Sequence, residues 1–573
     1  MVILNTDIAV IGGSLGGCAA ALAACRAGKQ VILTEEADWI GGQITSQGVS
    51  ALDEHEHIET FGGTATYYQL REAIRHYYPG SPRNPGNGWV SRLCFEPRAG
   101  LAALESLLQP FVASGQLEIL TGWRPTAADA ANGIVRSVTV TDDDGTTRTI
   151  NAAFFLDATE LGDLLPLTGT PYVTGAEADT GEEFAPPEPI PSENQSFTWC
   201  FAVEFCPGES HVIEKPAGYE PFRDSQPYSL TLVGADGATR RFYFFGGDLP
   251  FWTYRRMRDG AQLGGNDVAL INWHGNDYFG RNIIDVSDDE RDTALDEARR
   301  LSLGFLYWLQ TECPRDDGGF GYPELKLRPD VMGTADGLAK APYIREARRI
   351  VPLKRIHAYD ITADHQPLAR ATNQPDSVGI GWYALDLHPC VGQRETHIFA
   401  PTKPFQIPLG SLISMTTRNL IAACKNIGTT HLTNGAYRLH PIEWNIGESA
   451  GLLAATCIDR NIEPAQLWHN DFERLRLQYQ LASAGVPLTW AITDSPAPAL
   501  WVLLAQGVMS DTSDAARHLK IDLNAAIPDG TLRSDVLAHV NDLTETTSSL
   551  PQSLTWGALD RYYAVRFRAT FGT

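Results

Sequence analysis

The stretch Asp7-Ile-Ala-Val-Ile-Gly-Gly-Ser-Leu-Gly-Gly17 decides the fold of the first part of this sequence. Its apolar, β-branched beginning predicts a buried strand that ends at the first glycine. Residues 18–25 are mostly alanine, leucine and cysteine, a composition typical of a helix. Residues 30–34 then predict a second strand, which Glu35 closes. The stretch therefore predicts a strand–helix–strand unit with a glycine-rich first turn.

This turn has the residues that binding of a pyrophosphate requires. Gly12 permits the tight turn, Gly16 keeps the loop open, and Gly17 lets the helix pack closely on the strand. The N–H groups and the dipole at the helix start favour a phosphate. Ser14 replaces the middle glycine of the usual G-x-G-x-x-G pattern, and its small side chain can be accommodated. Glu35 is placed to accept hydrogen bonds from ribose hydroxyls, so the unit predicts a dinucleotide site.

Three further segments extend the pattern. Trp39-Ile-Gly-Gly-Gln43 places a glycine pair after the acidic residue, and residues 154–163 predict a buried strand that runs into a polar glycine turn. Residues 418–451 combine a strand, a glycine turn and a helix. Together these segments resemble the FAD-binding proteins of the glutathione-reductase type, within the broad family of FAD-dependent oxidoreductases. The resemblance covers roughly residues 5–165 and 405–460.

The resemblance implies FAD as the cofactor, but it specifies no substrate. It implies that the N-terminus of the helix in 440–451 points at the pyrimidine oxygen of the flavin. The implied FAD-binding residues are Gly12, Ser14, Gly16, Gly17, Glu35, Glu36, Gly42, Gln43, Ser46, Gly48, Ala158, Thr159, Asp163, Asn445 and Ile446.

The remaining sequence suggests how the chain is divided. Residues 134–150 alternate around a turn and predict a hairpin, residues 196–245 alternate like an antiparallel sheet, and residues 287–309 predict a long amphipathic helix. We predict an α/β protein with a discontinuous Rossmann-type FAD-binding domain (1–165 and 401–460), an inserted α+β substrate domain (166–400) and a C-terminal helical region (461–573). The last region could cover the FAD domain or form a subunit contact, which leaves a homo-oligomer open.

Composition excludes several classes of partner. The 573 residues exceed a single core, and the net charge of −24, without a dense basic run, argues against nucleic acid. The nine cysteines form no CxxC pair, so we expect a reducing compartment and no metal site. No apolar run of ~20 residues and no basic leader occur, which predicts a cytoplasmic protein without a membrane span.

The leading candidate for a catalytic base is His388. A strand-like alternation over residues 381–388 would place Trp382, Asp386 and His388 on one face. We therefore predict His388 as general base, Asp386 as its orienting partner and Trp382 as an aromatic wall. A buried structural pair is the alternative.

Other candidates lie elsewhere in the sequence. His55 follows the segment expected to pass the flavin, where it could act as a base or attach the cofactor covalently; an ordinary solvated loop is the alternative. His440 precedes a proline at the helix expected to face the flavin. The loop 272–278 could line a polar pocket or be a simple turn, and Arg345 could hold a substrate carboxylate or lie on a solvated helix face.

The sequence contains no second glycine fingerprint for NAD(P)H and no redox CxxC pair. The simplest reductant of the flavin is therefore the organic substrate. This predicts an oxidase or dehydrogenase that takes two electrons from a small polar molecule by hydride transfer to flavin N5. The alternatives are a flavin monooxygenase with an external reductant and a flavin-binding electron-relay or assembly protein.

Overall fold

The predicted strand–helix–strand unit forms as β1 (Val2–Ile11), α1 (Leu15–Arg26) and β2 (Val31–Glu35) in a computed structural model. The structure describes residues 2–178, 180–233, 238–392, 398–545, 550 and 554–572. Within these ranges, no helix combines the length and the apolar composition needed to cross a membrane.

The unit belongs to a seven-stranded sheet in the order β3-β2-β1-β6-β5-β4, with β21 paired to the end of β6. The other strands are β3 (Leu117–Thr121), β4 (Arg124–Ala131), β5 (Ile134–Thr141), β6 (Thr147–Asp157) and β21 (Leu420–Ala422). β3, β2, β1, β6 and β21 pair in parallel, whereas β5 pairs antiparallel with both β4 and β6. The predicted hairpin and the Rossmann-type α/β fold are therefore confirmed.

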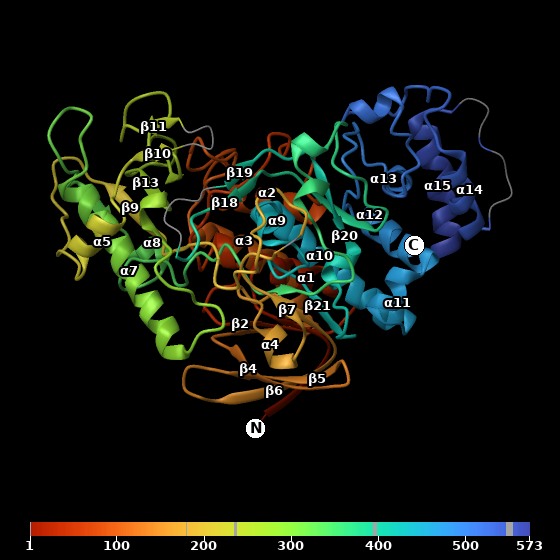
Figure 1. Cartoon of the computed structure of the whole chain (residues 1–573), viewed down its shortest axis with the longest axis horizontal. Helices are drawn as coiled ribbons and strands as arrows, with labels where there is room; N and C mark the ends of the chain where they lie inside the picture. The colour runs from red at the N-terminus through yellow and green to blue at the C-terminus, as the bar shows by residue number, and fades with distance from the viewer. Residues whose placement is uncertain are drawn as a thin grey trace.

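Helices α1 and α10 (His440–Arg460) pack against each other beside this sheet (Figure 1). Their contact depends on glycines, because no other residue leaves enough room. A Cβ at Gly447 would lie 1.9 Å from the carbonyl oxygen of Gly16, and one at Gly451 would lie 2.3 Å from that of Ala20. The close packing joins two helices that lie more than 400 residues apart in the sequence. Helices α2 (Ala65–His76), α3 (Pro97–Ala113) and α4 (Leu164–Thr168) complete this part.

A second hydrophobic core lies in the green and yellow part of Figure 1. It contains an antiparallel sheet in the order β12-β13-β9-β15 and the predicted amphipathic helix, α7 (Asp288–Thr311), which a Ser287–Glu290 capping box begins. The elements are β9 (Phe201–Phe205), β12 (Arg256–Arg258), β13 (Val268–Ile271), β15 (Leu325–Leu327), α5 (Tyr219–Ser225), α6 (Gly260–Leu263) and α8 (Pro329–Met332). Short strand pairs are β8 (Phe197–Thr198) with β14 (Asp277–Tyr278), β10 (Thr231–Val233) with β11 (Thr239–Arg241), and β7 (Tyr172–Val173) with β16 (Arg349–Ile350).

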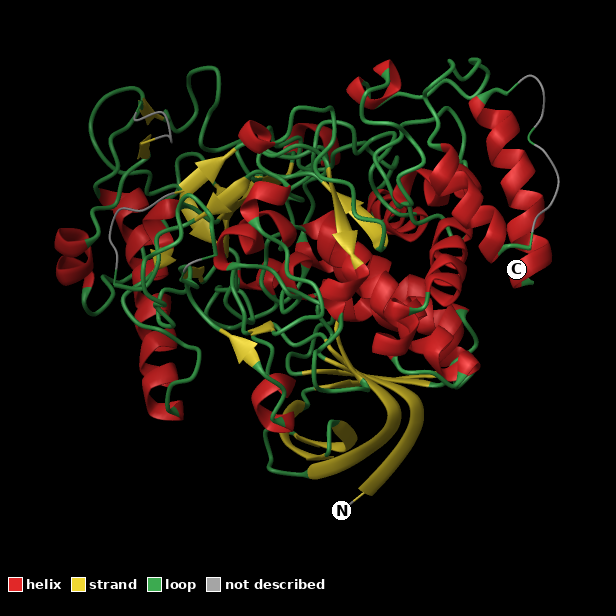
Figure 2. Cartoon of the chain, turned by 45° about the vertical axis from the view of Figure 1, so that its right-hand side comes forward, coloured by secondary structure: helices red, strands yellow, loops and turns green. Residues whose placement is uncertain are grey.

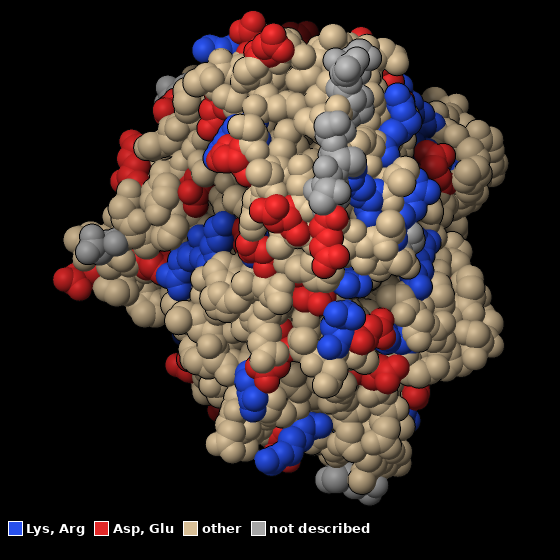
Figure 3. Space-filling model, turned by 90° about the vertical axis from the view of Figure 1, so that its right-hand side faces the viewer, with Lys and Arg blue, Asp and Glu red and all other residues tan. Residues whose placement is uncertain are grey.

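The C-terminal part is helical (Figure 2), and its core is continuous with that of the Rossmann-type sheet. Its helices are α11 (Pro464–His469), α12 (Asp471–Ser483), α13 (Pro498–Ala505), α14 (Ser534–Leu543) and α15 (Trp556–Phe571). Before them come β17 (Ser377–Gly381) with β20 (Phe405–Pro408), β18 (Leu385–Leu387) with β19 (Ile398–Ala400), and α9 (His431–Tyr437). On the face of Figure 3, basic and acidic side chains are interspersed. The domain boundaries stay a prediction.

Candidate functional site

The glycine turn between β1 and α1 is built so closely that added side chains do not fit. Gly12 has a φ of 102°, and a Cβ there would lie 2.3 Å from the Ala158 carbonyl. A Cβ at Gly17 would lie 2.0 Å from the Gly12 carbonyl oxygen. Ser14 caps the helix, because its Oγ accepts a hydrogen bond of 3.1 Å from the Gly17 N–H. The turn thus presents backbone where the sequence predicts a pyrophosphate.

A cavity adjoins this turn. Seven of the predicted FAD-binding residues line it: Gly12, Glu35, Glu36, Ser46, Ala158, Thr159 and Asp163. Glu35 is held at the tip of β2, because its carboxylate accepts hydrogen bonds from the N–H groups of Gly13 (2.8 Å) and Ala37 (2.9 Å). Backbone donors, a carboxyl group at the end of β2 and a hollow beside them are the groups that the adenosine diphosphate part of FAD requires. The residues fit this cofactor.

A buried charged cluster joins the beginnings of α1 and α10. Glu443 accepts a hydrogen bond of 3.0 Å from the Gly16 N–H, and its other oxygen pairs with Lys425 at 3.4 Å. Gln43 donates to Glu443, and Lys425 also pairs with Glu160. Burial alone would raise the pKa of Glu443, but the Lys425 ammonium lowers it below its ordinary value. The cluster holds an ionised carboxylate at the first turn of α1.

Gly42 and Gly48, two other predicted FAD-binding residues, lie where a side chain would be crowded by its neighbours. Gly42 has a φ of 50°, and a Cβ there would lie 2.3 Å from the Glu160 carboxylate. Gly48 has a φ of 78° and packs against Met332 and Ala339, with Cβ distances of 3.3 and 3.4 Å. Both positions therefore keep the 42–48 segment close to neighbouring elements.

Asn445 and Ile446 do not line the cavity. α10 begins at His440, so these residues lie in its second turn rather than at its N-terminus. Asn445 instead ties the helix to β17, because its amide donates to the Val378 carbonyl and accepts from the Ile380 N–H. The helix begins where the sequence predicts it, and the role of these two residues in binding FAD stays a prediction.

A second, polar cavity is lined by several distant segments of the chain, from Asp53 to Arg438. It is lined by three arginines, three tyrosines and two histidines: Arg255, Arg345, Arg438, Tyr254, Tyr343, Tyr383, His274 and His388. Asp53 and Asp386 also line it, and Arg255 reaches Asp53 at 3.4 Å. Arg438 donates a hydrogen bond of 2.8 Å to the Tyr343 hydroxyl. Such a lining can bind a small molecule with several polar groups.

His388 lies in this cavity, but its closest carboxylate is Asp277. Nδ1 of His388 is 2.6 Å from Asp277 Oδ2, whereas Nε2 is 3.8 Å from Asp386 Oδ2. Asp277 is fully buried and pairs with Arg345 at 2.9 Å. Asp277, from the predicted polar loop 272–278, therefore orients His388 more closely than the predicted partner Asp386 does.

The contacts among Asp277, Arg345 and His388 determine which of these three side chains carry a charge. Burial would raise the pKa of Asp277, but Arg345 and His388 lower it well below its ordinary range. Burial lowers the pKa of His388, Arg345 lowers it further, and Asp277 opposes the shift. His388 is consequently neutral at pH 7 and faces an ionised carboxylate. Arg345 is buried in this pair, so the alternative of a solvated helix face is wrong, while its role as a substrate ligand stays a prediction.

The other two predicted histidines lie outside the lining of the polar cavity. His440 is fully buried, and backbone atoms occupy both ring nitrogens: Nδ1 accepts from the Asp53 N–H at 3.0 Å, and Nε2 lies 3.2 Å from the Val49 carbonyl. Burial lowers its pKa to about 4. This arrangement favours a structural role over the predicted one as base.

His55 packs among aromatic rings. Its ring lies 4.9 Å from that of Trp490 and 6.2 Å from that of Trp382, and burial lowers its pKa to about 3. Trp382 therefore faces His55 and not His388, contrary to the expectation of one strand face. β17 ends at Gly381 and β18 begins at Leu385, so the alternation is interrupted between them.

One extended segment separates the two cavities. Ala341, Pro342 and Ile344 line the cavity beside the glycine turn, while Tyr343 and Arg345 line the polar cavity. The segment is fixed on both sides, since the Ala341 N–H donates to the Ser46 carbonyl and Tyr343 exchanges backbone hydrogen bonds with Thr198. The two cavities are thus neighbours with a single strand-like wall between them.

Sequence reasoning missed several residues of these sites. Arg255, Arg438 and Lys425 were not singled out, although each is a cation in a largely apolar or aromatic stretch. A charged residue that such a stretch buries needs a partner, and this was the available indication. The partners come from distant segments, so the pattern could not identify them.

Known proteins resemble this chain only distantly in sequence and structure. No curated protein matches the sequence. Among solved structures, the chain is similar to OxyS anhydrotetracycline hydroxylase from Streptomyces rimosus (11% identity, 99% of this chain and 76% of that chain, TM-score 0.31). It is also similar to a geranylgeranyl bacteriochlorophyll reductase-like protein from Thermoplasma acidophilum (10% identity, 84% and 88%, TM-score 0.29). L-proline dehydrogenase from P. horikoshii is matched over 24% of its length and 30% of this chain, at 15% identity and a TM-score of 0.16.

These structural likenesses are too weak to indicate a substrate. A family model described as FAD dependent oxidoreductase, in contrast, matches residues 7–478, which include the glycine turn, both cavities and the start of α10. The closer likeness to the glutathione-reductase type stays a prediction. The chain belongs to the family of FAD-dependent oxidoreductases, and FAD is its cofactor.

Proposed function

We propose that this FAD-dependent oxidoreductase is an oxidase or dehydrogenase that takes two electrons from a small polar organic substrate in the polar cavity. The observation that carries the proposal is the wall formed by residues 341–345, which puts the polar cavity next to the cavity of the glycine turn. If the adenosine diphosphate part of FAD occupies the first cavity, its flavin would have to reach past this segment to meet a substrate in the polar cavity, because hydride transfer requires contact between the two reacting atoms. The absence of a second nucleotide fingerprint in the sequence supports direct reduction by substrate.

FAD, when bound, supplies the redox chemistry by accepting a hydride from the substrate carbon. The chain's own residues would manage the proton. His388, neutral and oriented through Nδ1 by Asp277, would accept the proton of the substrate's hydroxyl or amino group. The phenols and guanidiniums of the cavity would hold the substrate's polar groups and position its carbon.

Anaerobic substrate screening of the FAD-loaded protein tests the proposal. We expect that a small polar alcohol, amine or related compound alone bleaches the visible absorption of the flavin. Bleaching that requires NADH or a reductase would instead indicate a monooxygenase. Stable flavin absorbance with every substrate, together with electron exchange with a protein partner, would indicate an electron-relay protein.

A further inference from the structure

A cluster of three metal-ligating side chains lies close to the polar cavity, at the beginning of α9. A carboxylate oxygen of Glu193, Sγ of Cys390 and a ring nitrogen of His431 lie within 4.8 Å of one another. Cys390 is 3% and His431 5% exposed, and Glu193 is half-buried. Neither the proposed reaction nor FAD binding uses these residues.

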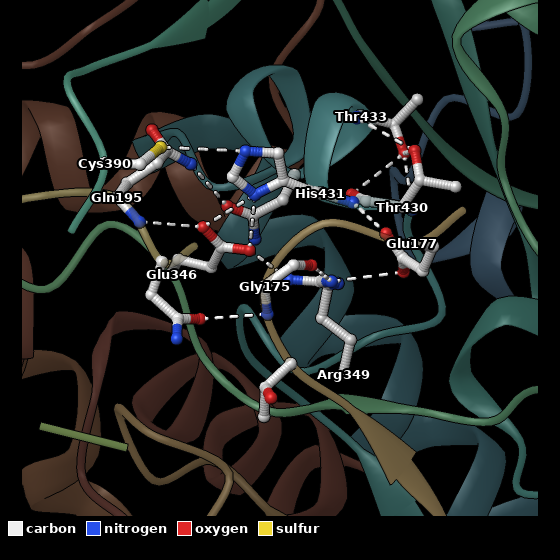
Figure 4. A network of polar contacts seen from close by, with 12 residues as sticks. Gly175, Glu177, Gln195, Glu346, Arg349, Cys390, Thr430, His431 and Thr433 are labelled. Atoms are coloured by element: carbon white, nitrogen blue, oxygen red, sulfur yellow. Dashed lines mark hydrogen bonds and ion pairs between the residues drawn. The ribbon is translucent and has the colours of Figure 1, made fainter. Parts of the chain in front are cut away.

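The orientation of His431 prepares one ring nitrogen for a ligand (Figure 4). Its Nδ1 lies 2.9 and 3.0 Å from the two carboxylate oxygens of Glu346, which is fully buried and paired with Arg349. Nδ1 therefore carries the proton, and Nε2 presents a lone pair on the other side of the ring. A carboxylate behind a histidine is the usual support of a metal-binding imidazole.

The lone pair of His431 points toward Cys390. The distance from Nε2 to Sγ is 3.7 Å. In a tetrahedral zinc site, bonds of about 2.3 Å to sulfur and about 2.0 Å to nitrogen place these atoms roughly 3.5 Å apart. The observed distance is thus close to the one that a shared zinc ion requires, with little movement of either side chain.

The charges of the cluster also match a divalent cation. Arg349 neutralises Glu346, which leaves a thiolate and the Glu193 carboxylate as two negative ligands beside a neutral imidazole. Thiolate and imidazole together favour zinc over magnesium or calcium. The thiol of Cys390 would lose its proton when the metal binds, because the thiolate is the form that ligates a metal. Binding would form one Zn–S bond and release that one proton to solvent.

We propose that Glu193, Cys390 and His431 bind one Zn²⁺ ion, with Glu346 as the supporting carboxylate of His431 and a water molecule in the fourth position. The sequence-based expectation of no metal missed this site because its ligands come from three segments without a Cys-x-x-Cys spacing. The site does not depend on the proposed reaction. It would fix Cys390, which bridges to Gln195, whose side chain accepts from the His388 N–H at 3.3 Å.

The test uses the FAD-loaded protein in a His211→Ala background, because Cys206, Glu209 and His211 form another such cluster near the surface. Bound metals are first removed with a chelator, Zn²⁺ is then supplied, and the unbound ion is dialysed away. We expect elemental analysis to find one Zn²⁺ per chain. Co²⁺ in its place should give the near-ultraviolet charge-transfer band of a cobalt–thiolate bond. Cys390→Ser should abolish this band, whereas Cys313→Ser, at another buried cysteine, should retain it.

Two milder variants keep the test decisive if Cys390→Ser misfolds. FAD content and circular dichroism would reveal such misfolding. Glu346→Gln should weaken Zn²⁺ binding by about 10–100-fold, the usual effect of losing such a support. Glu193→Gln removes a half-buried ligand and should also weaken binding without loss of FAD. Binding of Zn²⁺ should in addition protect Cys390 from iodoacetamide.

Three outcomes would overturn the proposal. The first is a parental protein that binds no Zn²⁺ in stoichiometric amount or gives no cobalt–thiolate band. The second is a Cys390→Ser protein whose band equals that of the parent. The third is rapid alkylation of Cys390 both with and without Zn²⁺, which would identify a free nucleophilic thiol assisted by His431.

Discussion

The two cavities are built in opposite ways. The cavity beside the glycine turn takes its shape from backbone, with positions such as Gly12 and Gly17 where a single added carbon would lie 2.0–2.3 Å from a carbonyl group. The polar cavity takes its properties from charged side chains, among them the buried pair of Asp277 and Arg345. Each cavity should therefore tolerate different substitutions. Added atoms should damage the first cavity, and removed charges should damage the second.

The largest expected effect comes from an added methyl group in the turn. Gly17→Ala would place a Cβ 2.0 Å from the Gly12 carbonyl oxygen, so the turn must shift and FAD should be lost. Gly28→Ala is the matched control, because nothing lies within 4 Å of its Cβ and only its φ of 80° costs about 1–2 kcal/mol. The flavin content of the purified proteins checks this. Equal flavin content in both variants would contradict a steric role for Gly17.

A charge in the same turn should act almost as strongly. Ser14→Asp would place a carboxylate against the pyrophosphate of FAD, so the cofactor should be largely lost. Ser14→Asn separates charge from shape, since asparagine and aspartate cap helices equally well. Fluorescence titration of the apoproteins with FAD measures both affinities. An Asp variant that binds FAD as tightly as the Asn variant would show that the turn is not at the phosphates.

In the polar cavity, the largest effect should follow removal of the proposed base. His388→Ala should slow anaerobic flavin reduction by about 10²–10⁴-fold, the usual contribution of a general base, with unchanged flavin content. Stopped-flow absorbance measures the rate. His440→Ala serves as a comparison, because it should reduce stability more than rate. A His388→Ala enzyme with the parental rate would eliminate the assignment.

The two carboxylates near His388 should differ in importance. Asp277→Asn should slow reduction by roughly 10²-fold, because the neutral amide no longer fixes the tautomer of His388. Asp386→Asn should cost less than about fivefold, since its carboxylate lies 3.8 Å from His388 Nε2, beyond hydrogen-bond distance. Unfolding curves of both proteins are needed, because Asp277→Asn leaves Arg345 buried without its partner. The opposite ranking of the rates would restore Asp386 as the orienting residue.

The smallest effect is a shift in pH dependence. Only neutral His388 can accept a proton, so the rate should fall as the pH falls through its pKa, which burial and Arg345 hold below the ordinary value. Arg345→Gln removes a nearby positive charge and should move this acidic limb to higher pH by about one unit. Arg438→Gln, in the same cavity, should leave the limb in place. A limb that does not move in the Arg345 variant would indicate another titrating group.

The same contrast explains what the sequence could reveal. Gly12, Ser14, Gly17 and Glu35 lie within 30 residues, and their spacing alone predicts the turn and its ligand. Asp277 and His388 lie 111 residues apart, so no local periodicity can indicate their contact. The start of α10 could be predicted from local sequence, because proline favours the first turn of a helix.

The glycine contact between α1 and α10 also has a consequence for synthesis of the protein on the ribosome. The segment of α1 is translated more than 400 residues before Gly447 and Gly451, against which it packs. Until those residues emerge, one face of α1 and the β6 edge that β21 later covers have no partner. Nascent chains of this length expose apolar surface and an open strand edge, which promotes aggregation. FAD added during cell-free translation should therefore raise the yield only once the chain has passed α10.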